Sequence, residues 1–366
     1  MSFLKRALKR SAVFVAVLLV FTFARVQACA GGGHDEVRLE YLAQRINHRE
    51  LPGLAPGHPF DGEWRLTALT MSVLAATNLS MRAPQTREQH ARQVGEWVAQ
   101  LASDEVRAYD TRQWGGADPL TTLDQPGAHA GYLGQLLLAM DAACLLGAER
   151  DESLHRAVAA SMARRLEAAP HGLLETYPGE IYVPDNVVTV AGLAQFDACQ
   201  GRPEHAALIA RWLTRLRTQW ADPENGLLVF APGQRARGSG AAWNSMFLPL
   251  IDARLARDQS DKMWATFGDE AGAGWLRGIR EGGAGEGDVD SGPLVLGVSP
   301  SATGFALADA TWHGRPERAG LLRTAELVGV SFGDHYLFSP LVGDAITLAA
   351  RTATPWTLSN GALARQ

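Results

Sequence analysis

The sequence predicts an all-α fold, an (α/α)6 toroid in which six inner helices are surrounded by six outer helices. Apolar residues recur at helical spacing along the chain, whereas the period-two alternation of strands does not recur. Segments that are apolar nearly all round alternate with amphipathic segments, as expected when an inner layer is buried on both sides. The helices form pairs of roughly 55 residues. A solenoid of helix pairs is the alternative, but no repeat at a fixed period is evident.

Proline and glycine mark the ends of the predicted helices, with Pro203 and Pro316 at helix starts and Gly147 and Gly201 at helix ends. In the first half of the chain the helices cover residues 35–49, 62–81, 87–106, 128–147, 152–168 and 184–199. In the second half they cover residues 204–220, 239–257, 259–277, 300–312, 316–328 and 340–350. The second helix of each pair is expected to be the inner one. Because no linker interrupts this pattern, residues 31–366 are predicted to form one domain.

Residues 1–30 have the form of a signal peptide. Four basic residues come first: Lys5, Arg6, Lys9 and Arg10. An apolar run over residues 12–24 follows, and it is shorter than the about 20 residues that a membrane-spanning helix needs. Small residues at Ala28 and Ala30 offer two cleavage sites. The mature protein is therefore expected to be exported, either periplasmic or secreted.

Three cysteines bear on how the exported protein is anchored and stabilised. A lipid anchor on Cys29 is the alternative to simple cleavage, but Arg25 occupies a position where that signal prefers a small or apolar residue. Membrane contact is expected only if Cys29 is lipidated. Cys144 and Cys199 lie near the ends of apolar helical segments, and export permits a disulfide between them. Free cysteines in the core are the slightly preferred interpretation.

Composition excludes several classes of function. The chain has 366 residues and a net charge of −5, without the basic surface that nucleic-acid binding needs. It has no nucleophile-elbow, zinc-protease, paired Cys-x-x-Cys or dinucleotide motif, so neither a cofactor nor a metal is predicted. Asp288 and Asp290 resemble the start of a calcium loop, but the remaining ligands are missing. A small molecule or a sugar is the expected substrate.

The residues that precede the inner helices are the candidate site. Inner helices of a toroid run parallel, so their N-termini gather at one end and form a funnel whose dipoles favour anionic groups. The candidate lining residues are Glu63, Trp64, His129, Tyr132, Gln135, Thr176, Tyr177, Tyr182, Asp185, Asn186, Arg237, Trp243, Asp288 and Asp290. This set is rich in carboxylates and aromatic rings and comes from segments far apart in the sequence.

Asp185 is the leading catalytic candidate. It follows Pro184, a typical helix starter, and so lies with Asn186 in the first turn of an apolar helix. An ionised Asp185 is a general base, and a neutral one is a general acid. The alternative is a simple helix cap. Tyr177 and Gln135 are candidates to orient a substrate hydroxyl, although each has an ordinary core role as its alternative.

Further candidates are assigned to the second half of the funnel. Arg237 is expected to pair with Asp185 or Asp290, or to meet an anionic substrate group, with a surface cap as the alternative. Asp290 and Glu63 are candidates for a second carboxylate. A histidine at a helix start, such as His129, is more often a cap than a catalyst.

The motifs and their order resemble the linalool dehydratase/isomerase family, over most of the mature chain. The matching segments are Thr176-Tyr177-Pro178, Tyr182-Val183, Asp185-Asn186, Tyr132-Leu133-Gly134-Gln135-Leu136, Gly116-Ala117-Asp118-Pro119 and Asp222-Pro223-Glu224-Asn225-Gly226. The resemblance implies an exported (α/α)6 fold, a ring-shaped homo-oligomer, and elimination or isomerisation of a hydroxylated small molecule. Thr176 and Asp185 stand where the family has cysteines, and Gln135 stands where it has histidine.

Three functions follow from these observations. The first is cofactor-independent acid/base elimination or isomerisation with Asp185 as the main proton-transfer group. The second, by fold analogy, is a glycoside hydrolase in which Asp185 faces Glu63, Asp288 or Asp290. The third is a non-catalytic exported binding protein, which a funnel plugged by Phe60 or Tyr336 would favour.

A group of apolar residues in the last part of the chain bears on assembly. Four apolar residues near the C-terminal side of the funnel suit either an interface or the core: Leu337, Phe338, Leu341 and Val342. The ring-shaped oligomer therefore rests on the family resemblance.

Overall fold

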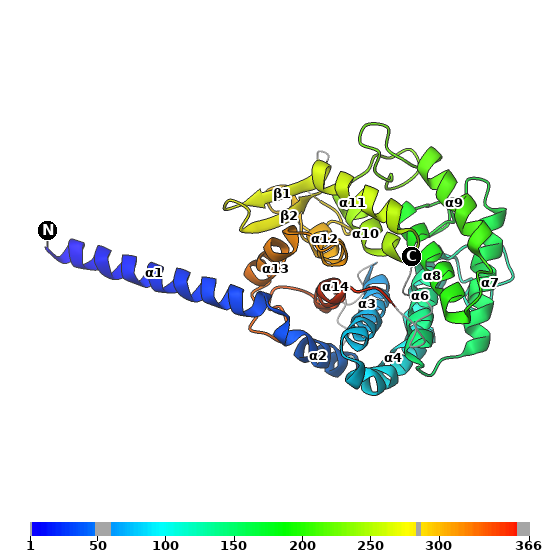
Figure 1. Cartoon of the computed structure of the whole chain (residues 1–366), viewed down its shortest axis with the longest axis horizontal. Coiled ribbons are helices and arrows are strands. Elements are labelled where there is room, and N and C mark those ends of the chain that lie inside the picture. Colours follow the sequence, from blue (N-terminus) through cyan, green and yellow to red (C-terminus); the bar gives the residue numbers. More distant parts are fainter. Residues whose placement is uncertain (1, 48–59, 283–286, 357–366) are drawn as a thin grey trace.

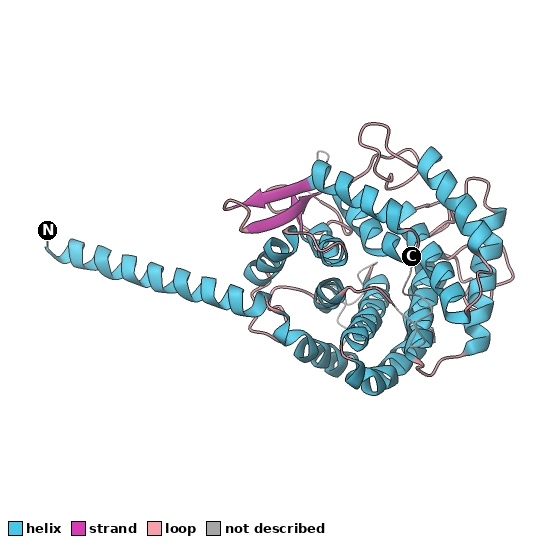
Figure 2. Ribbon diagram, in the orientation of Figure 1, coloured by secondary structure: helices cyan, strands magenta, loops and turns pink. Residues whose placement is uncertain are grey.

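The computed structural model describes residues 2–47, 60–282 and 287–356, and this part of the chain is mostly helical (Figure 1, Figure 2). The helices of the first half are α1 (Ser2–Ala30), α2 (Asp35–Asn47), α3 (Asp61–Arg82), α4 (Arg87–Leu101), α5 (Asp104–Gln113), α6 (Ala130–Leu146), α7 (Glu152–Ala168) and α8 (Val183–Gln200). Those of the second half are α9 (Ala206–Gln219), α10 (Gly238–Phe247), α11 (Ala253–Phe267), α12 (Pro300–Trp312), α13 (Glu317–Val328) and α14 (Leu341–Thr352). The prediction of an all-α fold class is confirmed at this level.

Alternate helices contact one another in a closed cycle. Helix α3 contacts α6, α6 contacts α8, and the series continues through α10, α12 and α14, which returns to α3. These helices carry most of the buried side chains; in α6, for example, nearly every residue from Ala130 to Leu146 is buried. Small residues allow close packing, since a Cβ on Gly192 of α8 would lie 2.9 Å from Leu137 of α6.

The intervening helices lie on the outside of this cycle. Helix α4 packs on α3 and α6, helix α7 packs on α6 and α8, and helix α9 packs on α8. Helix α11 packs on α10, helix α13 packs on α12, and helix α2 packs on α14 and α3. Their buried residues form a stripe, such as Val94, Trp97, Val98 and Leu101 in α4. This amphipathic stripe matches the prediction from the sequence.

The boundaries of most helices agree with the prediction within two residues. Residues 152–168 and 300–312 agree completely, and Gly147 and Gly201 end α6 and α8 in the left-handed conformation, with φ of 72° and 65°. Residues 48 and 49, predicted to end the first helix, lie outside the described residues.

Three predicted helices were wrong in extent. The helix predicted over 87–106 ends at Leu101, and Ser103 then caps a separate helix, α5. The helix predicted over 239–257 stops at Phe247, because a 3-10 turn containing Pro249 intervenes before Asp252 caps α11. Each missed break is a short polar or proline-containing turn within an otherwise helical apolar pattern.

The third error concerns strands, which were not predicted. The helix predicted over 259–277 ends at Phe267, and the chain continues as β1 (Gly268–Ala271) and β2 (Leu276–Arg280). They pair antiparallel, with Ala271 opposite Leu276, and β3 (Val298–Ser299) adds to the other edge of β2. Glycines at 268, 272 and 274 weaken helix formation there and permit the turn.

The N-terminal helix α1 projects away from the rest of the molecule (Figure 1). Within the described residues, Arg10–Ala30 is a stretch that is long and apolar enough, by length and composition, to cross a membrane. A signal sequence near the N-terminus passes the same test, so the helix is compatible with the predicted signal peptide. The apolar run over residues 12–24 was predicted to be too short to span a membrane. In the structure the helix continues through residues 25–30, so the helical segment is longer than that run.

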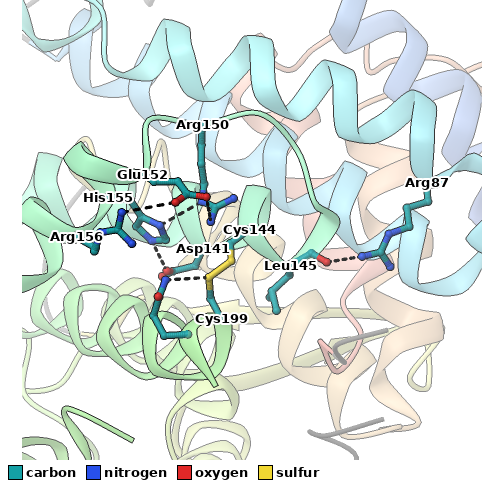
Figure 3. Close-up of a disulfide and its surroundings, with 10 residues drawn as sticks. Arg87, Asp141, Cys144, Leu145, Arg150, Glu152, His155, Arg156 and Cys199 are labelled. Carbon is teal, nitrogen blue, oxygen red and sulfur yellow. Dashed lines mark hydrogen bonds and ion pairs between the residues drawn. A yellow bond between two sulfur atoms is a disulfide. The ribbon is translucent and has the colours of Figure 1, made fainter. Parts of the chain in front are cut away.

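A disulfide joins the C-terminal ends of α6 and α8 (Figure 3). Cys144 and Cys199 have Cα atoms 6.1 Å apart, so the expectation of free cysteines was wrong. Sequence spacing could not place the two helix ends side by side. Nearby, His155 Nε2 lies 2.7 Å from Asp141 Oδ1, and burial raises the pKa of Asp141 and lowers that of His155 to about 4. Burial therefore disfavours the charged form of each group.

Replacing Cys144 and Cys199 by serine is expected to lower the free energy of unfolding by about 4 kcal/mol, from the loop entropy of a 55-residue separation. Urea denaturation under oxidising conditions measures this loss. A reducing agent should destabilise the unmodified chain and leave the double variant unchanged. Equal stability of the two proteins before reduction would contradict the prediction.

Candidate functional site

The N-terminal ends of α3, α6, α8 and α10 come together on one side of the molecule. Glu63 in the first turn of α3 reaches Tyr177, which precedes α8. A Cβ on Gly131, at the start of α6, would lie 2.9 Å from Thr176 and 3.8 Å from the carboxylate of Asp185. Such contacts require the helices to point their N-termini at a common region.

Glu63 is held by a tyrosine in this region. The Tyr177 hydroxyl donates to Glu63 Oε2 at 2.7 Å. Burial raises the pKa of Glu63 to about 8, and the negative charge of Asp185 adds to this effect, although the hydrogen bond from Tyr177 lowers it. Glu63 is therefore protonated at neutral pH.

Asp185 is held by a threonine. The Thr176 hydroxyl donates to Asp185 Oδ2 at 2.6 Å, and no hydrogen bond from Asp185 caps the described end of α8. The capping alternative therefore has no support in the geometry. Burial raises the pKa of Asp185 to about 6, partly offset by the bond from Thr176. At neutral pH this carboxylate is mainly ionised.

Glu63 and Asp185 are thus two interacting carboxyl groups whose pKa values lie on opposite sides of neutrality. Both side chains are surrounded by protein, yet both keep part of their surface accessible to solvent. A neutral acid beside an ionised carboxylate is the arrangement that general acid/base catalysis uses. Because the groups interact, their apparent pKa values belong to the pair.

Arg237 brings further carboxylates to the edge of this region. It pairs with Asp290 at 2.8 Å, with Asp288, and with Glu281 at 3.3 Å. Its guanidinium also lies 3.7 Å from the centre of the Phe230 ring. The predicted pairing of Arg237 with Asp290 is confirmed; Arg237 is also the N-cap residue of α10, although its side chain makes no capping bond. Asp288 and Asp290 therefore already have a charged partner in the structure, the guanidinium of Arg237.

A buried pair that the sequence analysis missed lies beside Glu63. His129 Nδ1 lies 2.5 Å from Asp110 Oδ2, and both side chains are fully buried. Asp110 also acts electrostatically on Glu63. His129 is the N-cap residue of α6, as expected, but its side chain makes no capping bond and pairs with Asp110 instead. Asp110 was missed because it lies on α5, a helix that was not predicted.

Trp114 connects this pair to the Asp185 side of the site. Its ring lies 4.3 Å, centre to centre, from that of His129, and its indole N–H donates to the backbone oxygen of Thr176 at 3.3 Å. His129 adopts φ of 51°, an uncommon conformation for a residue with a side chain. His129, Trp114 and Thr176 therefore form a continuous set of contacts that ends at Asp185.

Three candidates have structural roles instead. Tyr132 is fully buried, and its hydroxyl donates to the backbone oxygen of Leu101 at 2.8 Å. Asn186 bonds both backbone polar groups of Leu174, which fixes the segment leading into α8. Tyr182 donates to Glu180 near the surface. Their assignment to substrate binding has no support from these contacts.

Gln135 and two tryptophans remain candidates. The amide nitrogen of Gln135 lies 3.5 Å from Thr67 Oγ1, and its oxygen finds no partner among the described residues. Trp243 is partly buried against Phe305, with its indole N–H also unpartnered there. Trp64 packs on the core while remaining partly exposed. Gln135 on α6 and Trp243 on α10 thus each keep one polar atom without a hydrogen-bond partner among the described residues.

Comparison with protein-family models and with characterised proteins finds no match for this chain.

Glu63 should destabilise the fold at high pH. Its pKa is raised above that of the unfolded chain, so the folded protein holds more protons and loses stability as the pH rises from about 4.5 to about 8. Glu63→Gln is therefore expected to raise the free energy of unfolding by more than about 1 kcal/mol at pH 8.5 and little at pH 4.5. Urea denaturation at both pH values measures the difference.

The exposed residue Glu105 provides the matched control, since its side chain is 59% exposed and pairs with Arg65. Glu105→Gln should change stability little at either pH. A Glu63→Gln variant with no pH-dependent gain over this control would contradict the raised pKa.

Proposed function

We propose that this chain is an exported, cofactor-independent enzyme that uses Glu63 and Asp185 as an acid/base pair. The observation that carries the proposal is the geometry of two buried carboxyl groups, Glu63 held by the Tyr177 hydroxyl and Asp185 by the Thr176 hydroxyl, and burial raises their pKa values to about 8 and about 6. At neutral pH the pair holds one transferable proton and one free base, and the two groups are anchored by neighbouring residues, Tyr177 and Thr176. Positioned groups of this kind accelerate proton transfers by about 10²–10⁴-fold.

The reaction that suits the pair is elimination or isomerisation of a hydroxylated small molecule. Glu63 donates its proton to the leaving hydroxyl as the C–O bond breaks, and water departs. Asp185 removes a proton from the adjacent carbon, and the electrons of that C–H bond form the double bond. Return of water to another carbon, with the two groups in exchanged roles, gives isomerisation. Gln135, whose amide oxygen has no partner among the described residues, is the group proposed to orient the hydroxyl.

The fold component of the proposal is an (α/α)6 toroid resembling the linalool dehydratase/isomerase family. The closed cycle of α3, α6, α8, α10, α12 and α14 supports this. Thr176 and Asp185 occupy the positions of the family's cysteines, so a carboxylate and a hydroxyl replace thiol chemistry. The family resemblance also leads us to propose a ring-shaped homo-oligomer. Export of residues 31–366 is supported by the apolar N-terminal helix and by the disulfide, which is stable in oxidising compartments.

A glycoside hydrolase is the second candidate. It requires the same combination of a protonated and an ionised carboxyl group, so the Glu63–Asp185 pair favours it as well. Partly exposed Trp64 and Trp243 offer rings on which a sugar can stack. Release of reducing sugar from a panel of aryl glycosides and disaccharides would select this function over elimination.

A binding protein without catalysis is the third candidate, and Tyr336 gives it little support. The Tyr336 hydroxyl donates to Glu326, in a buried cluster with Arg38 and Arg351 between the N-terminal and C-terminal helices. It is committed to that cluster. Saturable ligand binding without any turnover would favour this function.

Asp185→Asn is expected to abolish turnover while preserving the helical circular dichroism spectrum, because the amide keeps the shape of the carboxylate and cannot accept a proton. The assay follows a panel of allylic alcohols by gas chromatography. Asp258→Asn is the matched control, since Asp258 lies on α11, is half exposed and pairs with Lys262. Equal turnover by Asp185→Asn and the control would contradict the proposed role.

Thr176→Val provides an independent test through pH. Thr176 lowers the pKa of Asp185, so removing its hydroxyl raises that pKa. Because Asp185 acts as the base, the acidic limb of kcat/KM should move to higher pH, with the maximal rate reduced less than in Asp185→Asn. An unchanged acidic limb would assign that limb to another group.

A further inference from the structure

The helix α1 consists of an exposed part and an embedded part. Residues 11–21 are exposed to solvent along their whole length, and they include Phe14, Leu18 and Phe21. Figure 1 shows this part projecting from the molecule. The last turns differ, because Val26 and Cys29 are buried. A signal peptide that is cleaved off has no reason to contribute to the core of the mature domain.

The embedded part is tied to the C-terminal helices by several contacts. Arg25 donates to the backbone oxygen of Ser331 at 2.6 Å, and the Cys29 thiol lies 3.7 Å from the same oxygen. Arg351 of α14 donates to the backbone oxygens of Cys29 and Gly31, at 3.4 Å and 2.6 Å. Helix α1 also packs along α13. Because Cys29 points into the protein, a lipid on its sulfur does not fit this packing.

Exposed apolar side chains lie at the end of α13 and in the loop that follows it, next to the point where α1 leaves the molecule. We call them the apolar collar, and they are Val328 (58% exposed), Phe332 (63%), Leu337 (53%) and Phe338 (77%). The loop is ordered by backbone bonds from Leu337 to Val330 and from Phe338 to Gly329. Arg25 of α1 lies 5.7 Å from the centre of the Phe332 ring, so the collar borders the helix.

A tryptophan contacts α1 close to the residue that the apolar collar contacts. Trp275, in the turn between β1 and β2, stacks on Phe23 with ring centres 5.7 Å apart. Its ring is partly exposed, while its indole nitrogen is buried and finds no partner among the described residues. Tryptophan is enriched at the boundary between lipid and water.

We propose that α1 is retained as a membrane anchor and that the apolar collar inserts into the headgroup region of the same bilayer. Cleavage after Ala28 or Ala30 would remove Arg25 and Val26 from the core and place a new ammonium group beside Arg351. The basic residues of the first ten positions favour a cytoplasmic N-terminus, which puts the domain on the opposite side of the membrane.

The length of α1 explains why the collar is needed. Arg10 and Arg25 are separated by 15 positions, which is about 22 Å of helix, against about 30 Å for the hydrocarbon core of a bilayer. When the side chains of Arg10 and Arg25 extend towards the headgroups, the gap between the length of the helix and the thickness of the hydrocarbon core becomes smaller. Insertion of the collar by about 5–10 Å, as amphipathic surface elements insert, removes the rest. The short anchor and the apolar collar therefore fit one bilayer together.

The first test follows the fate of α1 in bacteria that express the full chain. Retention predicts an intact mass that includes residues 11–24 and a protein that stays with the membrane in alkaline carbonate and is released by detergent. A soluble mature chain that begins at Cys29 or Gly31 would overturn the proposal.

The second test locates the collar in the purified full chain, reconstituted into phosphatidylcholine vesicles. Cys29 is buried and the other two cysteines are paired, so a thiol at Phe338→Cys can be labelled selectively with an environment-sensitive fluorophore. The matched control is Arg202→Cys, an exposed position between α8 and α9. Nitroxide-labelled lipid should quench the label at 338 at least twofold more than the label at 202.

Equal quenching at both positions would overturn insertion of the collar. A blue-shifted emission at 338 that depends on protein concentration and is insensitive to the nitroxide would also overturn it, because it would assign the collar to an interface between copies of the chain.

Discussion

Desolvation of carboxyl groups where the inner helices begin is the constraint on which the candidate site depends. Four helix starts bring Glu63, Asp185 and their neighbours into a region that is crowded with protein atoms. Two negative charges are costly there, so the pair keeps one proton at neutral pH. The fold thus creates a functional acid and a functional base from two residues that would both be ionised on the surface.

A helix dipole lowers the pKa of a carboxyl group at the helix N-terminus, whereas burial raises it, and the larger of the two effects decides the pKa. A helix N-terminus favours a carboxylate by about 0.3–1 kcal/mol, which is less than one pKa unit. Burial raises the pKa of Asp185 from 3.8 to about 6 and that of Glu63 from 4.5 to about 8, which corresponds to about 3 and about 5 kcal/mol. Burial therefore outweighs the dipole at both residues, and the arrangement costs stability that the large core must supply.

The same geometry separates the site from the stabilising elements. Cys144 and Cys199 join α6 and α8 near their C-terminal ends, about 25 Å along the helices from the starts that carry Asp185. The buried cluster of Arg38, Glu326 and Arg351 ties α2, α13 and α14 together and also holds the end of α1. The polar side chains of the candidate site face one another at the helix starts, and they take no part in these stabilising contacts.

The sequence predicted the helices well because their signals are local. Periodicity placed α7 and α12 at their observed bounds, and it predicted the buried stripe of α4. It also placed Asp185 and Tyr177 next to a helix start. It failed where the outcome depends on distant contacts. The disulfide, the Asp110–His129 pair and the Tyr177–Glu63 bond all join segments that are far apart in the sequence, and no local pattern encodes those distances. The strands β1 and β2 were missed because a short glycine-rich hairpin carries too few residues to outweigh a preceding helical pattern.

Titration of the two carboxyl groups tests the central claim most directly. Carbon-13 NMR of labelled carboxyl groups, with Glu63→Gln and Asp185→Asn for assignment, gives both pKa values in the folded protein. The account predicts that the resonance assigned to Asp185 titrates with an apparent pKa near 6 and the one assigned to Glu63 with an apparent pKa near 8. Removing Asp185 should lower the higher value, because its charge raises the pKa of Glu63. Two carboxyl groups that both titrate below pH 5 would contradict the account.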